Sequence, residues 1–317
     1  MKFWKVKRMN EIYVDNNATT RVDPEVYEEM IPYLRDAYGN PSSMHTFGGR
    51  ISKDLTKARQ HVAGILGASD ENEVIFTSCG TESNNTAIHA ALECYPHKKH
   101  LITSYVEHPA IKGVFEYYEE KGYTVDFITV DRRGRLDIDE LKSKIRDDTA
   151  IVSIMFANNE TGVIFPIKEI GMIVKEKGAL FHTDAVQAVG KIPLDVSALP
   201  VDMLSLSGHK IHAPKGVGAL YIRKGVPFRP LLIGGHQEKG KRAGTEDVAS
   251  IIALGKACQI AQSYLDDENT RVRSLRDKLE SDLLCKIDHS LVNGDKERGL
   301  PNTSNIRFAH LSGKCIL

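Results

Sequence analysis

Short apolar runs alternate with amphipathic helical patterns between about residues 50 and 225. A strand covered on both faces is apolar nearly throughout, whereas a helix that covers a sheet is apolar along one side only. The pattern therefore predicts an α/β fold with a mostly parallel sheet and crossover helices. The predicted strands are 73–77, 100–104, 124–128, 150–155, 179–183, 203–206 and 218–222. The helices predicted between them include 81–93, 109–121 and 167–177.

The pattern changes after Thr245, where a long helical stretch begins. Its leucines 275, 279 and 283 recur along one helical face, and two short strand-like runs follow at 290–293 and 305–309. We therefore expect a large domain over residues 21–250 and a smaller α+β domain over residues 251–317. Residues 1–20 are expected to contribute to the smaller domain. Because the pattern stops at Leu317 without a terminating signal, we expect the smaller domain to be incomplete.

The composition is that of an ordinary globular protein, with 317 residues, 41% of them hydrophobic, and 42 Lys and Arg against 42 Asp and Glu. A net charge of zero gives no reason to expect binding to nucleic acid or to an anionic membrane, since both need a basic surface. No apolar run approaches the roughly 18 residues of a membrane span. The first eight residues also lack the apolar stretch of a signal peptide. We expect neither nucleic acid nor a membrane as a partner.

The five cysteines are widely spaced, odd in number and without a CxxC pair. This spacing favours neither a disulfide framework nor a zinc site, so a reducing cytoplasm fits best. The histidine pairs 97/100 and 209/212 have no further ligands at a fitting spacing. We therefore predict no metal site.

The segment 202–218 is the most informative part of the chain. Its predicted strand leads through Ser207, Gly208 and His209 to Lys210, in a turn rich in glycine and proline. Sites in open α/β sheets lie at such strand ends. A lysine just beyond a buried strand is partly desolvated, which lowers its pKa and leaves an amine able to form a Schiff base. Alone this signal is weak, because most lysines are solvated.

A second strand end carries Asp184, followed by Gln187. An acid at this position is ordinarily a helix cap. Its functional interpretation is an ion pair with the protonated pyridine nitrogen of a cofactor, with Gln187 placed to hydrogen-bond the phenolic oxygen of the same ring.

A third strand runs through Gly80 into a helix that carries Thr81. The free N–H groups and the dipole at a helix start form a site for an anion such as phosphate, although Thr81 is equally well explained as an N-cap. Two further candidates are His108, which is placed to stack on a flat ring, and Asn159, which is placed to bind the ring or a substrate. Both also have ordinary explanations, as a surface or capping histidine and as a turn residue.

Together with the segments 13–20, 38–45 and 242–245, these motifs closely resemble the NifS/IscS-like cysteine desulfurases, which are class V, fold-type I pyridoxal-phosphate enzymes. The resemblance runs in order from about residue 11 to residue 309. It implies pyridoxal 5'-phosphate as cofactor, L-cysteine as substrate, L-alanine as product and a homodimer. The sulfur would leave as an enzyme persulfide, for an iron–sulfur scaffold or another acceptor protein in iron–sulfur or thio-cofactor assembly.

The resemblance also implies residue roles. Lys210 would carry the cofactor and, itself or through a neighbour, move the Cα proton of the substrate, and His108 would stack over the ring. Thr245 would reach the phosphate of the partner subunit's cofactor. The residues implied to bind the cofactor are Gly80, Thr81, His108, Asn159, Asp184, Gln187, Ser207, His209, Lys210 and Thr245.

The chain departs from the family pattern near its end. It stops before the loop that carries the family's nucleophilic cysteine and before the arginine that binds the substrate carboxylate. Cys315 falls where a helix begins in the family, and Cys79 is explained as a small residue behind the site. We therefore expect cofactor binding with impaired sulfur transfer.

Three alternatives remain at this stage. A non-catalytic scaffold or cofactor-binding remnant of the same fold is one, although such a protein need not keep Lys210, Asp184 and Gln187. Selenocysteine lyase activity is the second. Nucleotide binding is the third, since residues 235–242 nearly match a P-loop, but Arg242 stands where a Ser or Thr would bind magnesium.

Overall fold

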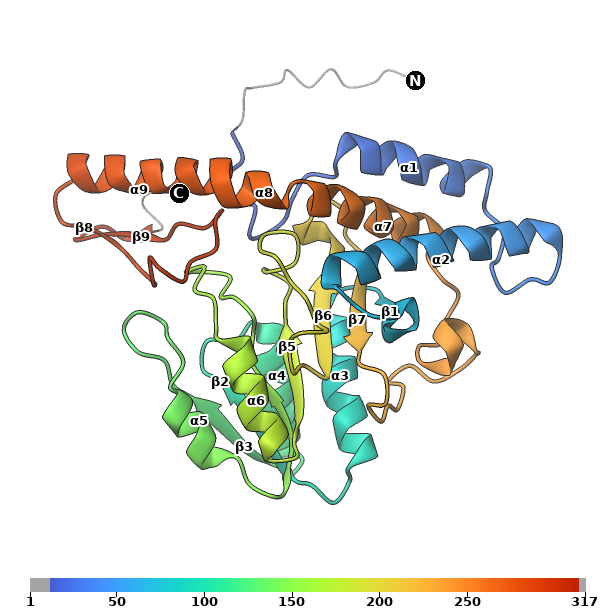
Figure 1. The fold of residues 1–317 in the computed structure, drawn as a ribbon, viewed down its shortest axis with the longest axis horizontal. Coiled ribbons are helices and arrows are strands. Elements are labelled where there is room, and N and C mark those ends of the chain that lie inside the picture. Colours follow the sequence, from blue (N-terminus) through green and yellow to red (C-terminus); the bar gives the residue numbers. More distant parts are fainter. Residues whose placement is uncertain (1–11, 314–317) are drawn as a thin grey trace.

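The computed structural model describes residues 12–313 and is built around a seven-stranded sheet in the order β1-β7-β6-β5-β4-β2-β3 (Figure 1). Only β7 runs antiparallel to its neighbours β1 and β6, and the other strands share one direction, so the predicted mostly parallel sheet is confirmed. The strands are β1 Val74–Thr77, β2 His100–Ser104, β3 Thr124–Ile128, β4 Thr149–Ser153, β5 Leu180–Asp184, β6 Met203–Ser207 and β7 Gly218–Ile222.

Helices cover both faces of this sheet. Successive strand residues point to opposite faces, so Leu101 packs in one buried cluster and Ile102 in the other. Helices α3 (Gly80–Cys94) and α4 (Pro109–Glu120) pack on the Leu101 side. The cluster on the Ile102 side includes residues of α2 Thr46–Leu66, α5 Ile138–Lys144, α6 Ile167–Glu176 and α7 Val248–Ser263. The result is a three-layer α/β sandwich.

The helices α1 (Pro24–Arg35) and α2 precede the first strand, and the sequence analysis predicted neither of them. Helix α2 buries Ile51, Leu55 and Val62 along one face and packs against α7, as does α1. These apolar positions recur with the period of a helix, so α2 could have been predicted from the hydrophobic pattern.

A nearly continuous helix leads from the large core to the C-terminal part of the described chain (Figure 1). It consists of α7, the short α8 (Leu265–Asp267), a π-helical turn at Glu268–Val272, and α9 (Arg273–Lys286). The predicted strand-like runs then form the antiparallel pair β8 (Ser290–Val292) and β9 (Ile306–Phe308).

The domain limits near residues 20 and 250 stay predictions. The limit at residue 250 falls inside α7, whose Ile251, Leu254 and Ala257 belong to the same buried cluster as the sheet. On α9, the predicted apolar face is largely open, with Leu275 56% and Leu279 51% exposed. Within residues 12–313, no helix is long and apolar enough to cross a membrane.

Candidate active site

The carboxyl ends of the parallel strands meet at one edge of the sheet, where they surround a cavity of about 280 Å³. This volume is close to the ~300 Å³ at the lower end of small-molecule sites. Every residue that the sequence analysis proposed for cofactor binding lines this cavity, except Thr245. The predicted residues therefore come together from the carboxyl ends of five strands, β1, β2, β4, β5 and β6, and the segments that follow them.

Lys210 ends a 3₁₀ turn, Gly208–Lys210, that directly follows β6. Its Nζ donates hydrogen bonds to the main-chain oxygens of Asn17 and Ala18, the latter at 2.8 Å. Burial lowers the pKa of Lys210, although the nearby Asp184 opposes this shift. The predicted partial desolvation is thus present, and it favours a free amine at this position.

Asp184 is the last residue of β5 and only 7% exposed. One carboxylate oxygen accepts from Val186 N at 3.0 Å, which is the capping contact that such an acid commonly makes. The other accepts from Asn84 Nδ2 at 2.7 Å. Burial raises the pKa of Asp184, and these two hydrogen bonds oppose that rise. A cation bound beside this carboxylate would be strongly stabilised, because Asp184 forms no ion pair with any of residues 12–313.

The start of α3 faces the same cavity. Its N-cap, Cys79, makes no side-chain capping bond, and Thr81 is the second helical residue, so the interpretation of Thr81 as the N-cap is wrong. A Cβ on Gly80 would lie 2.9 Å from Val186 and 3.4 Å from Ser207, so only glycine fits at this approach. The uncapped helix start suits an anion.

His108 caps α4, with Nδ1 accepting from Ala110 N at 3.1 Å. It therefore makes the ordinary capping contact and lines the cavity as well. Since Nδ1 accepts, a neutral His108 ring carries its proton on Nε2.

Asn159 lies in a turn shaped by the Asn158 side chain, whose Oδ1 accepts from the main-chain N–H groups of residues 160 and 161. This matches the turn chemistry expected from the sequence, and Asn159 still lines the cavity.

Gln187 and His209 are fixed by the segment before α1. Gln187 Nε2 donates to Asn17 O at 3.0 Å, and His209 Nδ1 lies 3.0 Å from Thr19 Oγ1. Burial lowers the pKa of His209, and the positive charge of Lys210 lowers it further. His209 is therefore a neutral hydrogen-bonding group.

Thr245 lies apart from these residues, in a second hollow of about 240 Å³ that Ser78 and Arg242 also line. The structure does not bring its side chain into the cavity of Lys210 within one chain. The role implied by the resemblance requires a second subunit, so this position stays a prediction.

Three residues of the site were missed by the sequence analysis as individual candidates: Asn84, Glu107 and Asn17. Asn84 follows Gly80 by one helical turn, a spacing from which it could have been predicted to face the same site. Its Oδ1 is buried and has no hydrogen-bond partner among residues 12–313. Asn17 accepts hydrogen bonds from Lys210 and Gln187 through a main-chain oxygen, which no sequence pattern reveals.

Glu107 lies behind the cavity, where its Oε1 accepts from Ser104 Oγ at 2.7 Å and from Met155 N at 2.9 Å. Burial raises the pKa of Glu107 to about 8, and its Oε2 has no hydrogen-bond partner in the described part of the chain. The carboxyl group is therefore largely protonated at neutral pH.

The segment that resembles a P-loop does not form one. It folds as a 3₁₀ turn at Gln237–Gly240, and its Glu238 carboxylate accepts two hydrogen bonds from Arg59, at 2.6 and 2.7 Å. A carboxylate at the centre of this turn disfavours phosphate, so nucleotide binding finds no support here. In the described part of the chain, no group of three or more His, Cys, Asp or Glu is placed to hold a metal ion.

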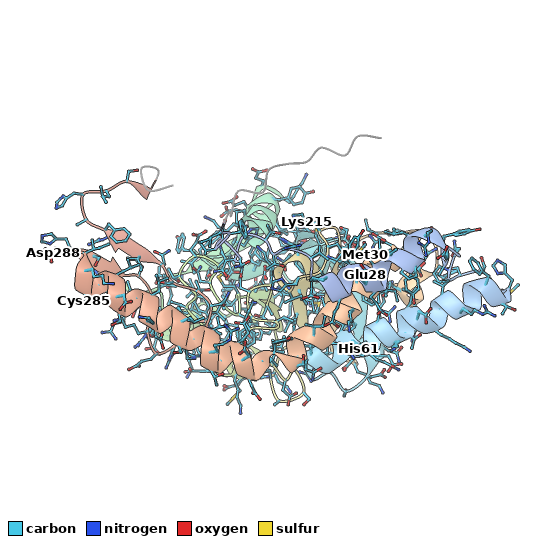
Figure 2. The ribbon with its side chains drawn as sticks, turned by 90° about the horizontal axis from the view of Figure 1, so that it is seen from above. Glu28, Met30, His61, Lys215, Cys285 and Asp288 are labelled. Carbon is cyan, nitrogen blue, oxygen red and sulfur yellow. The ribbon has the colours of Figure 1, made fainter. Side chains whose placement is uncertain are left out.

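Among the described cysteines, Cys79 lines the cavity, whereas Cys94, Cys258 and Cys285 do not. Burial raises the pKa of Cys94 and Cys258, which makes both poor nucleophiles. Cys285 lies near the end of α9, remote from the sheet (Figure 2). Cys315 lies outside the described residues.

The side chains of this cavity fit pyridoxal phosphate. An aromatic ring with a protonated nitrogen matches buried Asp184, a phosphate matches the uncapped start of α3, and an aldehyde matches the partly desolvated Lys210. The unpartnered Oδ1 of Asn84 is a further polar atom that a bound group would satisfy.

Comparisons with known proteins agree with this chemistry. The family model "Aminotransferase class-V" matches residues 12–316. The chain is 58% identical over 309 residues to a cysteine desulfurase of Trichormus azollae, covering 98% of this chain and 77% of that protein. It superposes on a solved "NifS-like protein" with a TM-score of 0.93 and 43% identity, covering 96% of this chain and 84% of the other. A structure described as "SspA in complex with cysteine" superposes with a TM-score of 0.84 at 34% identity, over 94% of this chain and 84% of the other.

The family match covers nearly the whole chain, and the relatives are similar both in sequence and in fold. The chain therefore belongs to the class V aminotransferases and, among them, to the NifS-like cysteine desulfurases, enzymes that use pyridoxal phosphate to remove sulfur from L-cysteine.

Proposed function

We propose that the cavity at the strand ends is the desulfurase active site and that Lys210 carries the cofactor. The observation that carries this proposal is the convergence of Lys210, Asp184 and the uncapped start of α3 on one cavity. Each alone has an ordinary structural explanation, whereas their meeting in one space of suitable size does not.

Pyridoxal phosphate, when bound, supplies an electron sink for the bonding electrons at the substrate Cα. The protein residues do the rest. Asp184, whose carboxylate accepts hydrogen bonds from Asn84 Nδ2 and Val186 N, would hold a proton on the ring nitrogen. The main-chain N–H groups at Gly80 and Thr81, together with Ser207 and His209, hold the phosphate. The Lys210 amine accepts the substrate's Cα proton, which its lowered pKa permits.

His108, Gln187 and Asn159 orient the ring and the substrate in this proposal. His108 is held by its capping bond to Ala110 N, so its ring cannot turn freely. Gln187 uses its amide nitrogen on Asn17 O, and its Oε1 has no hydrogen bond within residues 12–313. These fixed groups reduce the entropy lost when a flat ring binds between them.

We propose L-cysteine as the substrate of this site, since a related structure holds cysteine. The sulfur then passes to an acceptor protein for iron–sulfur or thio-cofactor assembly. Because three of the described cysteines are buried with a raised pKa or lie outside the cavity, we propose slow sulfur transfer by this 317-residue polypeptide. Replacing Cys79 with Ser tests the one described cysteine that lines the cavity: loss of sulfide release would identify Cys79 as a nucleophile and overturn this part of the proposal.

A homodimer is the further part of the proposal. The Leu232–Ile233 pair is exposed, Ile233 by 87%, and Leu232 O accepts from Ala243 N, which places it beside the segment of Thr245. An exposed apolar pair next to a second hollow is consistent with a subunit contact. We also propose a cytoplasmic location, since the described cysteines are all free.

The experiment that tests the site is reductive trapping. The purified chain is mixed with pyridoxal phosphate, reduced with borohydride and digested, and the modified peptide is identified by mass spectrometry. We expect the label on Lys210 and none on Lys215, an exposed lysine of the same loop (Figure 2). Equal labelling of several surface lysines would contradict the assignment of Lys210.

A further inference from the structure

Asn17 stands between Lys210 and the C-terminal part of the described chain. It belongs to the irregular segment before α1, and its neighbour Ala18 lines the cavity. The main-chain oxygen of Asn17 accepts hydrogen bonds from Lys210 Nζ and from Gln187 Nε2. Two side chains of the site are thus held by a single carbonyl group.

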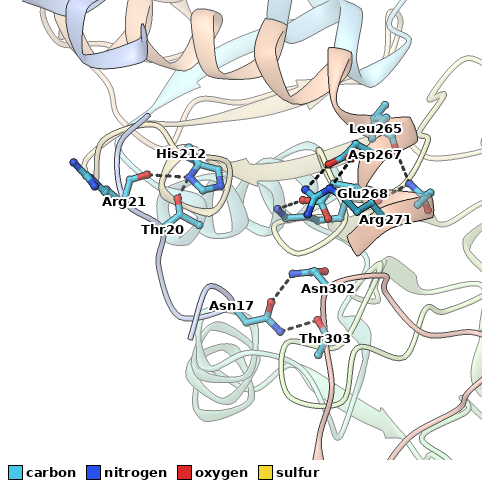
Figure 3. A network of polar contacts seen from close by, with 12 residues as sticks. Asn17, Thr20, Arg21, His212, Leu265, Asp267, Glu268, Arg271, Asn302 and Thr303 are labelled. Carbon is cyan, nitrogen blue, oxygen red and sulfur yellow. Dashed lines mark hydrogen bonds and ion pairs between the residues drawn. The ribbon is translucent and has the colours of Figure 1, made fainter. Parts of the chain in front are cut away.

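The side chain of the same residue points the other way, toward residues 302 and 303 (Figure 3). Asn17 Nδ2 donates to Thr303 Oγ1 at 2.9 Å, and Asn17 Oδ1 accepts from Asn302 Nδ2 at 3.1 Å. Nδ2 also donates to Asn159 O at 3.2 Å. Nearly every hydrogen-bonding position of this amide is therefore used.

The segment 298–303 is itself firmly attached to the Asn159 turn. Ile164 N donates to the main-chain oxygen of residue 298 at 2.7 Å, and Leu300 N donates to Gly162 O at 2.8 Å. Thr303 is only 6% exposed, and a Cβ on Gly162 would lie 2.8 Å from Thr303 Cβ. The segment has little freedom to shift without moving this turn.

A second attachment links the segment to the long helix. Arg276 of α9 donates from Nη1 to Leu300 O at 2.9 Å. The chain of contacts therefore runs from α9 through residues 300–303 and the Asn17 amide to the Lys210 amine.

We propose that Asn17 is a positioning residue, which transmits the position of segment 298–303 to Lys210 and Gln187. Its amide fixes the carbonyl group that holds the Lys210 amine, so a displacement of the segment changes the exposure of that amine. The importance of this coupling for catalysis rests on the proposed role of Lys210, whereas the coupling itself is a property of the protein without cofactor.

The test measures the acylation rate of Lys210 in the cofactor-free chain, with an amine-reactive acetylating reagent and peptide mapping. We expect Asn17→Ala to raise the rate about fivefold. This is the factor expected when the Lys210 amine loses roughly one hydrogen bond, the one to the main-chain oxygen at position 17. Thr303→Val keeps the shape of the side chain and removes the hydroxyl acceptor, so it should raise the rate in the same direction. Asn16→Ala, at an exposed neighbouring asparagine, is the matched control and should change nothing.

The double variant separates coupling from independent damage. If Asn17 and Thr303 act through the same contact, combining Asn17→Ala with Thr303→Val should give no more acceleration than Asn17→Ala alone. Additive effects, or an Asn17→Ala rate equal to that of Asn16→Ala, would overturn the proposal. Should Asn17→Ala fail to fold, as judged by near-UV circular dichroism, the milder Thr303→Val decides alone: an unchanged rate rejects the coupling. If the trapping experiment finds no cofactor on Lys210, the proposed function is rejected. The acylation rates of the cofactor-free chain would still test the coupling between Asn17 and Lys210.

Discussion

Asn84 holds the Asp184 carboxylate through a buried hydrogen bond of 2.7 Å. Asn84→Ala removes a donor that stabilises the ionised form, so we expect pyridoxal phosphate to bind about tenfold more weakly. Asn84→Asp should be worse, because a second carboxyl group would face Asp184. Equilibrium dialysis measures the affinity, with Asn85→Ala on the same helix as the control. Equal affinities of Asn84→Ala and Asn85→Ala would contradict this role.

Glu107 should make the free energy of unfolding decrease as pH rises. Its pKa is about 8 in the folded protein, and it is near 4.3 in an unfolded chain. Between these values the unfolded state loses the proton and the folded state keeps it, so stability falls as pH rises. The slope is at most about 1.4 kcal/mol per pH unit.

Urea denaturation at several pH values between 5 and 8 checks this expectation. Glu107→Gln carries no titrating group, so its stability should fall less steeply with pH than that of the parent protein. Identical slopes for the two proteins would show that Glu107 is ionised in the fold.

Much of the site could be predicted from the sequence, because Lys210, Asp184 and Gly80 each lie at or close to the end of a recognisable strand. Asn17 and Glu107 do not, for different reasons. Asn17 acts through its main-chain oxygen, and Glu107 becomes unusual only through burial. Both properties arise from tertiary packing and have no local pattern.

The start of α3 is the element that approaches the proposed phosphate position most closely. Gly80→Ala would place a methyl group 2.9 Å from Val186, so the helix start must shift. We expect cofactor affinity to fall at least tenfold, as for other displaced binding groups. In Gly113→Ala the added Cβ, in the middle of α4, meets nothing within 4 Å.

Gly113→Ala is the control for Gly80→Ala: it should stabilise the fold by about 0.5–1 kcal/mol and leave cofactor affinity unchanged. Dialysis and thermal denaturation of both variants check this pair of expectations. Unchanged affinity in Gly80→Ala would show that the helix start does not contact the cofactor.

Elements with continuous apolar runs were predictable, and the interior strands agree to within about two residues with the expected ranges. Helices α1 and α2 were not predicted, although α2 has a regular apolar face. The π-helical turn at Glu268–Val272 leaves no mark in the hydrophobic pattern, since it differs from an α-helix only in hydrogen-bond register.

For the whole molecule we proposed a homodimer, with the exposed Leu232–Ile233 pair beside the segment of Thr245 at the contact between subunits. We expect sedimentation equilibrium to show a dimer, and Ile233→Asp to shift it toward monomer, because a buried unpaired charge opposes association. Met172→Asp changes an apolar side chain of α6 that is 59% exposed and serves as the control. A monomeric parent protein, or equal effects of both changes, would contradict this contact.

The visible absorption spectrum of the chain with pyridoxal phosphate, before and after L-cysteine, tests most directly whether this cavity is the desulfurase site. We expect a band above the free cofactor's background that Lys215→Ala keeps, Lys210→Ala loses and L-cysteine changes. A band that survives in Lys210→Ala, or one that does not respond to L-cysteine, would contradict the assignment of this cavity as the desulfurase site.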